Sequence, residues 1–183
     1  MHVISHNHIW HAKDLQPGSS QWKHLWADDH GSCWIFERTQ ALELLQQFGM
    51  DNLYSDVPII ALLFHNQHLF NGFGRHTAND VLFWLKIFPT TPASHIFADK
   101  DHFQAFASGL AAYVDQFCTR TFFRNVAGEV NSTNPLTYNY KSGRNYISMY
   151  VKIFRKHWCK VPRQLYNEML VQGLFDPQHV IGM

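Results

Sequence analysis

The chain has few of the features that mark disulfide-rich, membrane-bound or secreted proteins. It contains three cysteines in 183 residues, and no C-x-x-C pair, which argues against a disulfide framework and a four-thiolate zinc site. Its longest apolar run, residues 59–64, is far shorter than the roughly 20 residues that cross a bilayer. The first residues lack the basic start and apolar stretch of a signal peptide. These absences predict a soluble, cytoplasmic protein with no membrane partner.

Motifs of common enzyme classes are missing as well. No serine lies in a G-x-S-x-G turn, and neither the phosphate-binding G-x-x-x-x-G-K-[ST] motif nor the dinucleotide-binding G-x-G-x-x-G motif is present. No pair of carboxylates stands out from those expected on a solvated surface. The sequence therefore names no reaction, and we expect no cofactor.

Length and composition predict a single globular domain. The chain is 46% hydrophobic and 15% aromatic, which supplies enough apolar surface for one core. Three regions follow one another: an irregular segment rich in His and Trp over residues 1–34, a helical core over 35–118, and a basic C-terminal third over 119–183. The predicted fold class is α-rich α+β, with about five helices and a possible C-terminal β-hairpin.

Hydrophobic periodicity places the predicted helices. The clearest amphipathic segment runs from Asp99 to Phe117, and its three-and-four spacing predicts that Phe103, Phe106, Leu110 and Phe117 are buried. Gly49 suits the left-handed position that ends a helix, so the first helix is expected to stop there. The five predicted helices cover residues 35–48, 58–70, 78–88, 99–117 and 162–171.

Residues 145–158 fit two patterns. Ile147, Met149, Val151 and Ile153 alternate with more polar residues, as in a half-buried strand that could pair with residues 136–140 across a turn at 141–144. The same segment also fits one face of a helix, formed by Ile147, Tyr150, Val151, Phe154 and Trp158. Its content of β-branched and aromatic residues favours the strand, and hence the hairpin.

The C-terminal third is the most basic part of the chain. Residues 120–183 hold nine Lys and Arg against three Asp and Glu, whereas residues 1–56 hold three against seven. Between Glu129 and Glu168 there is no acidic residue, and the cations alternate with aromatic residues. Cations attract phosphates and exposed rings stack on bases, so this pattern predicts a nucleic-acid-binding surface. The predicted contact residues are Lys141, Arg144, Tyr146, Lys152, Arg155, Lys156, Trp158 and Arg163.

The leading hypothesis is therefore a non-enzymatic domain that binds DNA or RNA, as a subunit of a larger assembly or alone. The same basic residues also suit an acidic protein surface, or a solvated face whose aromatic residues point into the core. A second hypothesis is a protein-interaction subunit that binds no nucleic acid and uses Trp10, Trp22 and Trp26 as anchors.

A third hypothesis, from another class, is a small metal- or histidine-dependent hydrolase or transferase. His6 and His8 would point the same way on a strand, and His65 and His68 share one face of a helix. No acidic or thiol residue lies within the cluster of His6, His8 and His11 to complete a metal site. We therefore expect that cluster to hold no metal tightly.

Overall fold

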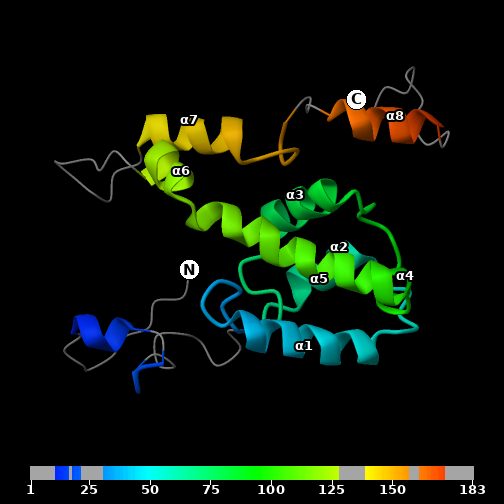
Figure 1. Cartoon of the computed structure of the whole chain (residues 1–183), viewed down its shortest axis with the longest axis horizontal. Coiled ribbons are helices and arrows are strands. Elements are labelled where there is room, and N and C mark those ends of the chain that lie inside the picture. Colours follow the sequence, from blue (N-terminus) through cyan, green and yellow to red (C-terminus); the bar gives the residue numbers. More distant parts are fainter. Residues whose placement is uncertain (1–10, 17, 22–30, 128–138, 157–160, 172–183) are drawn as a thin grey trace.

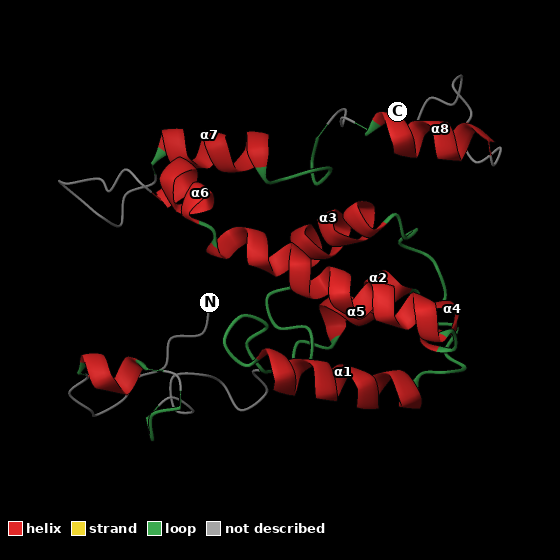
Figure 2. Ribbon diagram, in the orientation of Figure 1, coloured by secondary structure: helices red, strands yellow, loops and turns green. Residues whose placement is uncertain are grey.

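The computed structural model describes residues 11–16, 18–21, 31–127, 139–156 and 161–171. These residues form eight α-helices and no strand, with one isolated β-bridge between Pro58 and Pro92 (Figures 1 and 2). The predicted helical character is thus confirmed. The α-helices are α1 (Arg38–Asp51), α2 (Ile59–His65), α3 (Arg75–Leu85), α4 (Ala93–Phe97), α5 (Lys100–Asp115), α6 (Arg120–Phe122), α7 (Tyr140–Met149) and α8 (Arg163–Val171).

Helices α1 to α5, together with residues 31–34, form the helical core. Helix α5 packs against α1, α3 and α4, as Figure 1 shows, and it supplies the predicted apolar face. Phe106 and Leu110 are fully buried, as predicted, whereas Phe103 and Phe117 are partly buried at the edge of the cluster. Helix α5 begins where Asp99 accepts a hydrogen bond from the backbone N–H of His102 at 2.8 Å.

Gly49 lies inside α1, which corrects the prediction that it ends the helix. The helix continues to Asp51, because Gly49 is needed for packing rather than for a turn. A Cβ at this position would lie 3.1 Å from Cδ1 of Phe97 and 3.3 Å from Cε2 of Phe103. The missing side chain therefore lets α1 approach the two phenylalanines closely.

Residues 31–34 are anchored on the loop that follows α2. The indole of Trp34 donates to the carbonyl of Leu69 at 3.0 Å, and the Asn71 amide donates to the carbonyl of Gly31 at 3.1 Å. A Cβ on Gly31 would lie 1.9 Å from the carbonyl oxygen of His68, so only glycine fits there. The residues on both sides of Cys33, just before α1, are thus fixed to the loop after α2.

The predicted C-terminal β-hairpin is wrong, because its second half is helix α7. The alternating pattern would bury Ile147 and Met149 on one face, yet their exposed fractions are 53% and 48%. The side chain of Asn139 instead caps the helix by accepting from the N–H of Ser142 at 3.1 Å. The other predicted pattern, a helical face through Trp158, holds only in part, because α7 ends at Met149 and residues 150–156 follow as an irregular turn. Residues 136–138 lie outside the described residues.

The C-terminal helix predicted over 162–171 is confirmed as α8. Gln116–Cys118 form a 3-10 turn, η3, at the end of α5, and Phe123–Ala127 form a π-helical turn, η4, after α6. Within the described ranges, no helix combines the length and the apolar character that a membrane span requires.

Candidate functional site

The basic residues of the C-terminal third are positioned by the α6–α7 module, which we define as residues 119–127 and 139–156. In it, α6 and η4 lie beside α7 (Figure 1). The ring of Phe122 contacts Tyr146 and Tyr150, which are four residues apart and therefore on one face of α7. The amide of Asn145 also donates to the carbonyl of Asn125 at 2.7 Å.

A buried carboxylate, that of Asp80, makes several of the contacts between the module and the core. Asp80 lies on α3 and has no exposed surface. Its oxygens accept three hydrogen bonds from the backbone N–H groups of Lys152, Ile153 and Phe154, at 2.9, 2.8 and 3.1 Å. A buried charge is tolerated only where hydrogen bonds compensate its desolvation. The Asp80 carboxylate therefore depends on the N–H groups of the turn after α7, and the carboxylate in return holds that turn in place.

A polar and aromatic cluster surrounds this contact. Nε2 of His76 lies 3.1 Å from the hydroxyl of Tyr146 and 3.8 Å from Oδ2 of Asp80. The imidazole ring also packs against the ring of Phe154, with centroids 5.5 Å apart. The buried hydroxyl of Tyr113 has no hydrogen-bond partner among the described residues.

Both tyrosines of this cluster are harder to ionise than usual. Burial raises the pKa of Tyr146, and the negative charge of Asp80 raises it further. Burial likewise raises the pKa of Tyr113, again with a contribution from Asp80. The half-buried Tyr146 thus faces the core and serves as a neutral hydrogen-bonding group.

Two of the residues predicted to contact phosphates, Lys152 and Lys156, form hydrogen bonds within the chain. Nζ of Lys152 donates to the carbonyl of Met149 at 3.0 Å, and Nζ of Lys156 donates to the carbonyl of Val151. These carbonyls lie at or just beyond the end of α7, where a cation is favourable. Lys152 therefore contacts the C-terminal end of α7, and Lys156 contacts the turn that follows it.

The predicted arginines are more accessible. Arg144 and Arg155 are exposed, and the guanidinium of Arg155 lies 5.3 Å from the centre of the Phe154 ring. Arg155 also adopts a left-handed backbone conformation, with φ of 55°. Lys141 is exposed on the first turn of α7. Trp158 lies outside the described residues.

The sequence analysis missed two residues, Arg120 and Arg124, which are exposed on α6 and η4. Arg124 precedes Asn125 and Arg144 precedes Asn145, and these two asparagines are joined by a hydrogen bond. A signal was available: between Asp115 and Glu168 the only acidic residue is Glu129. Both arginines precede Glu129 and therefore lie outside the acid-free run between Glu129 and Glu168.

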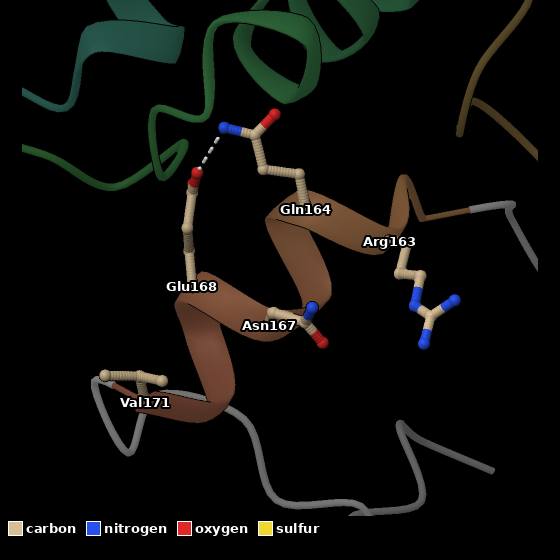
Figure 3. Close-up of a pocket in the computed structure, with 5 residues that line it drawn as sticks. All are labelled: Arg163, Gln164, Asn167, Glu168 and Val171. Carbon is tan, nitrogen blue, oxygen red and sulfur yellow. Dashed lines mark hydrogen bonds between the residues drawn. The ribbon is translucent and has the colours of Figure 1, made fainter.

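Arg163 lies on α8, apart from the α6–α7 module (Figure 1). Together with Gln164, Asn167, Glu168 and Val171 it lines a shallow, open hollow, in which Gln164 donates to Glu168 at 2.9 Å (Figure 3). Glu168 also accepts from Nζ of Lys86 at 2.8 Å, which ties α8 to the end of α3. Arg163 therefore does not belong to the group of basic residues on the α6–α7 module.

The histidines do not gather into a metal site in the part of the chain that the structure describes, where no group of three potential ligands occurs. His65 and His68 are both exposed. His6, His8 and the tryptophans at 10, 22 and 26 lie outside the described residues. The alternatives that depend on those five residues therefore stay predictions.

Comparisons with protein-family models, with curated proteins and with solved structures found no match. Function must therefore be argued from the residues of the α6–α7 module and their surroundings.

Proposed function

We propose that the chain binds nucleic acid through the α6–α7 module, by electrostatic contacts to phosphates with little sequence preference. The contacts would come chiefly from the four exposed arginines of the module. These are Arg120, Arg124, Arg144 and Arg155, with Lys141 beside them.

The observation that carries this proposal is a contrast in how arginines and lysines are paired. In the core, Arg38 forms an ion pair with Asp115 and Lys86 forms one with Glu168 on α8, so two of the four core cations are neutralised within the described residues. No acidic residue occurs in the described part of the α6–α7 module, and its four arginines form no ion pair within the described residues. Unpaired guanidinium groups on one small module suit phosphate contacts, which bind without reading sequence.

Two exposed aromatic residues replace Tyr146 as candidates for stacking on bases. Tyr140 and Phe123 have exposed fractions of 73% and 55%, and they lie at the start of α7 and of η4. Tyr146 is assigned instead to the contact with the core. Stacking by Tyr140 and Phe123 would favour single strands, whose bases are accessible.

The test measures the affinity of the full chain for single- and double-stranded DNA and RNA as salt concentration changes. Four phosphate contacts predict that log affinity for duplex DNA falls with log salt at a slope of about −3 to −4. The double variant Arg124→Gln/Arg144→Gln should flatten that slope by roughly 2. A matched control, Lys13→Gln/Lys100→Gln, removes two exposed charges outside the module and should leave the slope unchanged.

Two results would overturn the proposal. One is an absence of binding to every nucleic acid at low salt. The other is an equal loss of slope in the control variant, which would mean that net charge rather than the module attracts the ligand. Binding of an acidic protein in place of nucleic acid would support the alternative in which the basic residues contact an acidic protein surface.

A further inference from the structure

Cys33 and Cys118, which are far apart in the sequence, are brought to the same end of the helical core. Cys33 lies one turn before α1, and Cys118 lies in the 3-10 turn that follows α5. The guanidinium of Arg38 links these two places. It donates to the carbonyl of Trp34, next to Cys33, at 3.3 Å, and it forms a two-armed ion pair with Asp115, three residues before Cys118.

The position of Cys33 is restrained by contacts on both sides. Gly31 and Trp34 are held on the loop after α2, and the backbone N–H of Cys33 donates to the carboxylate of Glu37 at 2.8 Å. Cys118 is exposed and Cys33 is partly exposed, so a small reagent can reach both thiols. Desolvation raises the pKa of Cys118, and the nearby carboxylate of Asp115 raises it further, so this thiol is the less reactive of the pair as the first to attack.

We propose that Cys33 and Cys118 are a redox-active pair that forms a reversible disulfide on reaction with a low-molecular-weight disulfide such as oxidised glutathione. One protein thiolate attacks a sulfur of the small disulfide, forms a mixed disulfide and releases one small thiol. The second protein thiol loses its proton to solvent and attacks the protein sulfur of the mixed disulfide, which expels the second small thiol. The protein dithiol is oxidised, and one small disulfide is reduced to two thiols.

This disulfide would fasten the start of α1 to the end of α5, from which the α6–α7 module continues. The ion pair between Arg38 and Asp115 already holds these two helix ends together, but it is exposed to solvent and weakened by salt. A covalent bond at the same place is insensitive to salt. The pair is thus a modification site that acts on the connection between core and module.

The experiment treats the native full chain with oxidised glutathione, blocks the remaining thiols, digests the protein and identifies cross-linked peptides by mass spectrometry. We expect a Cys33–Cys118 cross-link that has lost two hydrogen atoms and is reversed by dithiothreitol. The variant Cys159→Ser should keep this cross-link. Cys33→Ser and Cys118→Ser should each leave glutathione attached to the remaining partner.

The same reaction in denaturant is the control, because an unfolded chain has no preference for one pair among its three cysteines. The proposal is overturned if the native protein carries glutathione on both Cys33 and Cys118 without a cross-link. It is equally overturned if Cys118 pairs with Cys159. The wild-type peptide map gives this answer even where a variant fails to fold.

Discussion

The helical core and the α6–α7 module differ in what holds them in place. In the core, whole side chains such as Phe70, Leu63 and Leu110 are removed from solvent, and α5 contributes buried residues along its length. In the module, α7 has no buried residue, and Val151 is the one buried apolar residue in its described part. Hydrophobic area stabilises the core, whereas a few directional contacts around Asp80 place the module. The two regions should therefore respond differently to substitution.

The largest expected effect is on the core. Phe106→Ala removes a ring that is 1% exposed and packs edge-on against Phe97, with centroids 6.1 Å apart. The lost contacts and the resulting cavity should cost on the order of 3–5 kcal/mol of unfolding free energy, measured by urea denaturation. Phe88→Ala is the matched control, because Phe88 is 72% exposed and should change stability little. Similar losses in both variants would contradict the assignment of the core.

An intermediate effect is expected at the junction. Asp80→Asn keeps the shape of the side chain but removes its charge and one acceptor oxygen, which weakens three hydrogen bonds to backbone N–H groups. Bonds to a charged group contribute more than neutral ones, so docking of the module should weaken by about 2 kcal/mol. Hydrogen exchange of residues 140–156 should accelerate while amides in α1 and α5 stay protected.

The control for this junction is Asp101→Asn, which changes an exposed aspartate in the first turn of α5. It should leave exchange in residues 140–156 unaltered. If Asp80→Asn accelerates exchange in core and module alike, the two regions form one cooperative unit and the distinction between them fails.

The smallest expected effect is at α8. Hydrogen bonds from Lys86 and Gln164 lower the pKa of Glu168. Since the pKa in the folded protein lies below its usual value, the attachment is complete above that usual value and is lost as pH falls through the folded pKa. Glu168→Gln should leave the melting temperature unchanged and accelerate hydrogen exchange within α8, because the pair is exposed. A large drop in melting temperature would show that α8 belongs to the core.

The sequence predicted features that depend on periodicity and on the start of the last helix, but not the end of α1. The spacing of Phe106 and Leu110 identified α5, and Pro162 identified the start of α8. The prediction of a strand was wrong at residues 145–153. There the same residues satisfy both the alternating and the helical spacing, and only the exposure of Ile147 and Met149 distinguishes the two patterns. Local spacing cannot choose between two patterns that the same residues satisfy.

The junction could not have been predicted, for a different reason. The partners of Asp80 are backbone N–H groups, which every residue except proline carries, so no side-chain pattern marks Lys152, Ile153 and Phe154 as its partners. The role of Gly49 depends likewise on Phe97 and Phe103, which approach it only in the folded chain. The basic character of the candidate site was visible in the sequence, but the inward position of Tyr146 was not.

The contact made by Asp80 also sets an order of events during synthesis. Its partner at residue 152 is 72 positions further along the chain. At the usual rates of translation, about 5–20 residues per second, Asp80 leaves the ribosome roughly 4–14 s before its partner. The carboxylate stays hydrated during that interval and becomes buried only when the turn after α7 reaches it. We therefore expect docking of the α6–α7 module on α3 to be a late step that follows packing of the core.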